Sequence, residues 1–99
     1  ETSSDEVMRM IVVTGEGAWQ VETPLLHRTF TGSGDLTTAM FLAHLLATGS
    51  AADALSATAS IVYSVLEQTA RLDQSELALV AAQANLTDPA FRFEATRLP

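Results

Sequence analysis

Hydrophobic and polar positions follow a two-residue period at the start of the chain. Residues 8–14 form a run rich in β-branched side chains, and the Gly-Glu-Gly sequence of residues 15–17 follows it. Trp19 and Val21 then alternate with more polar neighbours until Pro24. Such runs are typical of strands, glycines suit a tight turn, and proline ends or bends a strand. The pattern therefore predicts a β-hairpin.

The middle of the chain changes to a helical period. Residues 35–47 carry apolar side chains on nearly every face, so we expect a helix that is buried on several sides. Gly49 suits the C-terminal cap of this helix. Ser50 and Asp53 have the spacing of an N-terminal capping motif, which predicts a second helix that runs to about Arg71.

A third helix and a last strand complete the expected order. A second capping pattern predicts a helix over residues 75–84, and the alternation in residues 91–96 predicts a strand. The order is then hairpin, glycine-rich loop, three helices and final strand, an α/β arrangement. Two or three strands cannot cover so apolar a first helix, so we expect the missing strands in a further part of the polypeptide or a tight oligomer.

Composition supports the expectation of a partial domain. The 99 residues are 47% hydrophobic and 17% charged, whereas about 25% charged is usual. A free-standing domain of this size needs more polar surface than this. The chain starts at Glu1 rather than at a methionine, and we expect residues 1–6 to be disordered or a linker.

Charge and cysteine content exclude several classes of function. Twelve acidic residues face five arginines, which gives a net charge of −7. Nucleic acids and acidic membrane surfaces require a basic patch, so neither is an expected partner. The sequence has no cysteine, which excludes disulfides and thiolate metal sites and fits a cytoplasmic protein. It also has no secretory signal and no apolar run long enough to span a bilayer.

The segment Thr31-Gly32-Ser33-Gly34-Asp35 carries the candidate chemistry. It directly precedes a helix, where small residues admit a ligand and the free N–H groups favour an anion. Phosphoryl transfer needs such donors together with a carboxylate that accepts the proton of a hydroxyl. A flexible loop in which Asp35 caps the helix is the plainer interpretation, and spacing alone favours it, since a lone Gly-x-Gly is a weak motif.

Residues 31–37 resemble the Gly-Thr-Gly-Asp signature of ribokinase-like (PfkB-type) small-molecule kinases. Residues 10–14, 18–19 and 23–26 resemble the hairpin that precedes this signature in bacterial pyridoxal kinases. Residues 76–83, 88–89 and 93–98 resemble the C-terminal end of the same family. The resemblance covers nearly the whole chain and implies the C-terminal part of one ribokinase-like kinase domain with a three-layer α/β/α fold.

The resemblance also implies roles for individual residues. Asp35 corresponds to the catalytic base, which contacts the 5′-hydroxymethyl group of a vitamin B6 vitamer. The backbone of Gly32, Ser33 and Gly34 corresponds to the anion hole for the γ-phosphate, with Ser33 in place of the commoner threonine. The candidates for the nucleotide side are Leu26, Phe30 and Thr31.

The implied activity is ATP-dependent phosphorylation of the 5′-hydroxyl of pyridoxal, pyridoxine or pyridoxamine. Mg²⁺, a monovalent cation and a homodimer follow from the resemblance alone, and we expect the isolated 99 residues to be inactive without the N-terminal part. No metal-binding residue is predicted, since His44 has no histidine or carboxylate four residues away and His27 fits a solvated loop. The alternatives are a sugar or hydroxymethylpyrimidine kinase and a non-catalytic interaction module.

Overall fold

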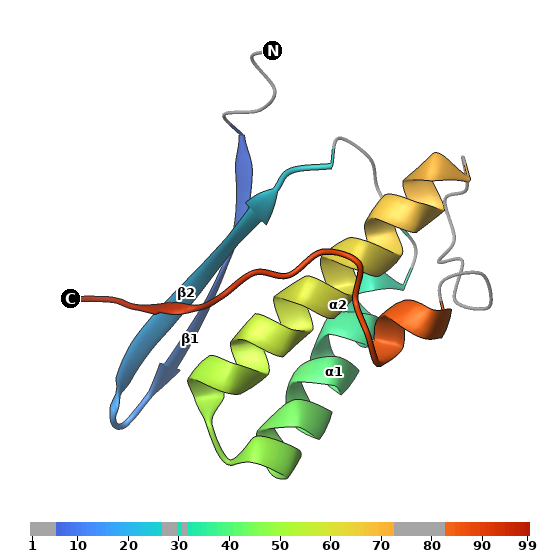
Figure 1. Ribbon diagram of the computed structural model, residues 1–99. Helices are drawn as coiled ribbons and strands as arrows, with labels where there is room; N and C mark the ends of the chain where they lie inside the picture. The colour runs from blue at the N-terminus through green and yellow to red at the C-terminus, as the bar shows by residue number, and fades with distance from the viewer. Residues whose placement is uncertain (1–5, 27–29, 31, 73–82) are drawn as a thin grey trace.

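The computed structural model describes residues 6–26, 30, 32–72 and 83–99. In these residues, α2 packs against the sheet on one side and against α1 on another (Figure 1). The elements, in chain order, are β1 (Val7–Thr14), β2 (Gly17–Pro24), α1 (Ser33–Thr48), α2 (Ala51–Arg71), the 3₁₀ helix η2 (Gln83–Leu86) and β3 (Thr96–Arg97).

The predicted hairpin is confirmed. β1 and β2 pair antiparallel with Thr14 opposite Gly17, so Gly15 and Glu16 form a two-residue turn. The Arg97 guanidinium closes over this turn and donates a hydrogen bond to the Glu16 carbonyl at 2.6 Å. A Cβ atom on Gly17 would lie 2.7 Å from that guanidinium, so any side chain there would require the end of the Arg97 side chain to move.

The core forms along α2, which confirms the second predicted helix. Ser50 caps the helix by accepting a hydrogen bond from the Asp53 N–H at 3.1 Å, as expected. Two clusters of side chains are buried along its length. The first contains Val21, Leu55 and Ala59, with Met10, Val12, Trp19, Phe41, Phe93 and Ala95 packed around them; the second contains Ile61 and Val65, with Leu36, Met40 and Leu86.

Helix α1 differs from the expectation of burial on several sides. It begins two residues earlier than predicted and ends at Gly49, whose φ of 69° is the left-handed cap conformation. None of its residues is buried, and the side chains of Leu42 and Leu46 are 53% and 85% exposed. Since α2 covers only one side of α1, the rest of its apolar surface has no cover within the described part of the chain.

The predicted final strand is mostly wrong. Only Thr96 and Arg97 join the sheet, where they pair with Gln20 and Trp19 of β2. Residues 91–95 are extended but lie along α2, and serine hydroxyls of that helix replace the partners a strand would supply. Most of the predicted third helix, residues 75–82, lies outside the described residues, and residues 83–84 belong to η2.

Candidate functional site

The N-terminus of α1 presents backbone N–H groups without a partner inside the helix. Gly32 is the N-cap residue, and the first intrahelical bond runs from the Leu36 N–H to the Gly32 carbonyl at 3.0 Å. Among the described residues, no side-chain hydrogen bond caps this end, in contrast to Ser50 on α2. The amides of Ser33 and Gly34 therefore point along the helix axis, where the helix dipole favours an anion.

The glycines of the motif keep this helix end accessible. Gly32 has a φ of 90°, a conformation that other residues adopt only with strain. A Cβ atom built on Gly34 would meet no atom within 4 Å, so no side chain in the described part of the chain, its direct neighbours aside, fills the space beside it. The backbone is thus shaped and open for close approach by a ligand.

Asp35 is the third residue of α1 and is exposed. The plainer interpretation, in which its carboxylate caps the helix, is wrong, because Gly32 is the N-cap and no side-chain cap bond forms. The Asp35 carboxylate therefore lies in the same first turn as the open amides without a capping role.

A cavity of about 620 Å³ lies between the hairpin, the first turns of α1 and the middle of α2. Four predicted site residues line it: Leu26, Phe30, Ser33 and Gly34. Gly32 and Asp35 do not line it, and Thr31 lies outside the described residues. The other lining residues are Met8, Met10, Thr23, Pro24, Thr37, Thr38, Val62, Tyr63 and Leu66.

Two threonines and a tyrosine that line the cavity are absent from the predicted site residues. Thr37 and Thr38 follow Ser33 and Gly34 by one helical turn, so the i, i+4 rule would have placed them on the same face. Tyr63 lines the cavity but is not among the predicted site residues. Burial and the Glu67 carboxylate raise the pKa of its hydroxyl, which stays neutral at physiological pH.

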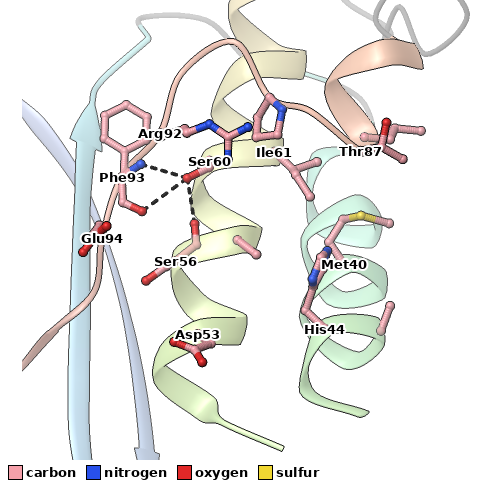
Figure 2. Close-up of a pocket in the computed structure, with 14 residues that line it drawn as sticks. Met40, His44, Asp53, Ser56, Ser60, Ile61, Thr87, Arg92, Phe93 and Glu94 are labelled. Carbon is pink, nitrogen blue, oxygen red and sulfur yellow. Dashed lines mark hydrogen bonds between the residues drawn. The ribbon is translucent and has the colours of Figure 1, made fainter. Parts of the chain in front are cut away.

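A second cavity, of about 710 Å³, opens between α1, α2 and the C-terminal segment (Figure 2). His44, Asp53, Arg92 and Glu94 lie around it, and none of the predicted site residues does. Within the described residues, no three histidine or acidic side chains come close enough together to hold a metal ion. The predicted site residues therefore lie away from this larger cavity.

No family model matches the chain. The pyridoxal kinase PdxY of Rubrobacter xylanophilus is 50% identical over 91 residues, which cover 92% of this chain and 31% of that protein. The PdxY of Corynebacterium diphtheriae is 38% identical over 98 residues, or 99% of this chain and 34% of that protein. The resemblance to pyridoxal kinases is confirmed. The chain spans about a third of the length of these relatives and matches their C-terminal part.

Solved pyridoxal kinases share the fold. The enzyme of Trypanosoma brucei matches 93% of this chain and 34% of its own, with a TM-score of 0.79 and 19% identity. The enzyme of Plasmodium falciparum, solved with AMP-PNP and PL, matches 94% and 32% with a TM-score of 0.70 and 15% identity. The chain thus has the α/β fold of the C-terminal part of a ribokinase-like kinase, as predicted.

Proposed function

We propose that this chain is the C-terminal portion of a pyridoxal kinase, which transfers the γ-phosphate of ATP to the 5′-hydroxyl of pyridoxal, pyridoxine or pyridoxamine. The observation that carries the proposal is the N-terminus of α1, which no side chain of the described residues caps and which lies beside an apolar cavity. The chain is 50% identical over 91 residues to a pyridoxal kinase. A free helix N-terminus binds phosphate, and an apolar cavity suits a nucleotide base.

In this proposal, the backbone amides of Gly32, Ser33 and Gly34 hold the oxygens of the γ-phosphate. They stabilise the negative charge that is spread over these oxygens in the transition state. Since their donors are backbone groups, serine serves at position 33 as well as threonine would.

Asp35 acts as the base in the same step. Its carboxylate accepts the proton of the 5′-hydroxyl while the hydroxyl oxygen forms a bond to the γ-phosphorus and the bond to ADP breaks. At about 100° per residue, Asp35 lies roughly 60° around the helix from Thr38, which lines the cavity. The vitamer would therefore bind beside the cavity, with the N-terminal part of the polypeptide forming the rest of its pocket.

Leu26, Phe30 and Thr31 are the proposed nucleotide contacts. Leu26 and Phe30 line the cavity together with Met10 and Leu66, an apolar surface that fits a purine ring. Mg²⁺ and a monovalent cation are further expectations from the family. The described residues offer no group of three metal ligands, so we derive no step through either ion.

The remaining partners are proposals of the same kind: a B6 vitamer, the N-terminal portion of the polypeptide and a second subunit of a homodimer. A cytoplasmic location, without binding to nucleic acid or membrane, fits the acidic composition. No helix among the described residues is both long and apolar enough to cross a membrane. None of the structural observations favours a sugar kinase, a hydroxymethylpyrimidine kinase or a non-catalytic module.

A substrate panel tests the proposal. The full-length protein that contains this chain is incubated with ATP and, separately, pyridoxal, hydroxymethylpyrimidine or ribose, and ADP release is followed. We expect the highest kcat/KM with pyridoxal. Preference for either other substrate would replace the proposed activity with that kinase activity, and nucleotide binding without any ADP release would favour the non-catalytic module.

A further inference from the structure

Serine side chains of α2 bind the backbone of the C-terminal segment, residues 91–95, which has no neighbouring strand to pair with among the described residues. Ser60 and Ser64 are four residues apart, so they lie about 6 Å apart along one side of the helix. Alternate residues of an extended chain are separated by about 6.6 Å. Residues 91–95 can therefore run along this side of the helix and meet one serine at every second residue.

The hydrogen bonds reflect this agreement between the spacing of the serines and the spacing of alternate residues in the segment. The Phe93 N–H donates to the Ser60 hydroxyl oxygen at 2.8 Å, and that oxygen is 3.2 Å from the Phe93 carbonyl (Figure 2). Ser64 binds Phe91 in the same way, at 2.9 Å and 3.3 Å. Both serines are buried, so these bonds satisfy backbone groups that water does not reach easily. The two serines therefore fix the register of the segment on the helix.

The two phenylalanines fixed in this way hold Tyr63. The tyrosine ring lies edge-on to the rings of Phe91 and Phe93, with centroid separations of 5.2 Å and interplanar angles of 87° and 79°. Edge-to-face pairs of this geometry are favourable beyond their buried area. A shift of the segment by one residue would move both phenyl rings to the other side of the extended chain and release the tyrosine.

Tyr63 also lines the cavity that we assign to the nucleotide. We propose that the C-terminal segment, through Ser60 and Ser64, positions the Tyr63 ring as a wall of this cavity, where the ring contacts the base of ATP. This inference rests on the proposed nucleotide site and makes Tyr63 a binding residue and the two serines positioning residues. The C-terminal segment would thereby influence a cavity that is lined by Leu26, Phe30 and the first turns of α1.

The physical reason lies in the shape of the nucleotide base. A base is flat and apolar on both faces, and a ring already held in place loses little rotamer freedom when the base binds. Apart from Phe30, the other apolar side chains around the cavity are not aromatic, and Met8, Met10 and Leu66 are flexible. A fixed aromatic wall would therefore contribute strongly to affinity for the base and leave the transfer step unchanged.

Calorimetric titration of the full-length protein with AMP-PNP tests the inference, alongside KM values for ATP and pyridoxal and the melting temperature. Tyr63→Leu should weaken AMP-PNP binding roughly five- to tenfold, in the range of losing one base–aromatic contact. Ser60→Ala and Ser64→Ala should each weaken it about threefold or more, while kcat and the KM for pyridoxal stay within about twofold. Tyr63→Phe keeps the ring and should bind as the wild type does.

Ser56→Ala is the matched control. Ser56 accepts a hydrogen bond from the Ala95 N–H at 2.8 Å, so its loss costs stability in the same way but releases no aromatic ring. We expect a lower melting temperature with unchanged AMP-PNP affinity. Equal losses of affinity in Ser56→Ala and Ser60→Ala would overturn the inference.

The Tyr63→Leu background separates positioning from general damage. There Ser64→Ala should have no further effect on AMP-PNP affinity, because the ring it positions is gone. Unchanged affinity in Tyr63→Leu itself would refute the inference, even if a serine variant failed to fold. A protein that binds AMP-PNP through Tyr63 but phosphorylates no vitamer would refute only the proposed function, and one that binds no nucleotide would refute both.

Discussion

Replacing Asp35 by asparagine should separate catalysis from helix stability. Asp35 occupies the third position of α1 and Asp53 the third position of α2, and both side chains are exposed. Each carboxylate interacts favourably with its helix dipole, by about 0.3–1 kcal/mol at such sites. Neither side chain is the N-cap, so Asp35→Asn and Asp53→Asn should lower the free energy of unfolding by similar, small amounts.

The activities of the two variants should differ sharply. Asparagine keeps the size of the side chain but cannot accept a proton, and a positioned base contributes about 10²–10⁴-fold to the rate. We therefore expect kcat of the full-length protein to fall by about that factor in Asp35→Asn, with little change in the KM for ATP, and to stay within about twofold in Asp53→Asn.

Steady-state kinetics of both variants with ATP and pyridoxal, together with urea unfolding, provide the measurement. A kcat for Asp35→Asn within about threefold of the wild type would remove Asp35 from the role of base, because acid–base catalysis contributes far more. A rise in the KM for pyridoxal at constant kcat would instead make Asp35 a residue that holds the substrate.

Three further results are expected. The isolated 99-residue chain should transfer no phosphate, since half of a site neither positions both substrates nor stabilises the transferred charge; ADP release by the purified chain would contradict this. The isolated chain should also bind a hydrophobic dye, because Leu46 and Val13 are 85% and 74% exposed, whereas a dye-free monomer with a cooperative unfolding transition would show that no cover is missing. In the full-length protein, Gly49→Ala should cost about 1–2 kcal/mol of stability, since alanine is strained at a φ of 69°. Gly15→Ala is the control, because a Cβ at either glycine would meet no atom within 4 Å but Gly15 does not have a positive φ. Equal losses of stability in urea unfolding would argue against the strain.

Local physical chemistry made the hairpin and the helix ends predictable. The Gly-Glu-Gly turn, the Ser50 cap and the left-handed Gly49 each depend on residues that are neighbours in the sequence. The glycines at the start of α1 also followed from residue type, although the helix begins two residues earlier than predicted. These features followed from spacing and residue type, and the structure places them where they were expected.

The features that were missed depend on residues far apart in the chain. Residues 91–95 alternate as a strand does, but their hydrogen-bond partners are serine side chains 27 to 39 residues earlier. Alternation predicts an extended backbone and does not specify what pairs with it. Likewise, the position of Tyr63 on the cavity follows from how α2 packs against the hairpin and α1, which no local pattern contains.

The exposure of α1 could not be predicted either, for a different reason. Its sequence is apolar on most sides, yet α2 covers only one of them within the described residues. The rule that an apolar helix is buried concerns a complete fold, and this chain matches a third of its relatives' length. The exposed side chains of Leu42 and Leu46 fit a helix whose cover belongs to another part of the protein.

The central claim is tested most directly by following the phosphoryl group itself. The full-length protein is mixed with γ-labelled ATP and pyridoxal in a single turnover, and the labelled product is identified by mass and by the position of the label. The account predicts label on the 5′-oxygen of pyridoxal, formed rapidly by the wild type and at a rate lowered about 10²–10⁴-fold by Asp35→Asn. The account would be contradicted if the label remained on ATP or passed to water in the wild type. It would also be contradicted if Asp35→Asn formed labelled pyridoxal phosphate as fast as the wild type.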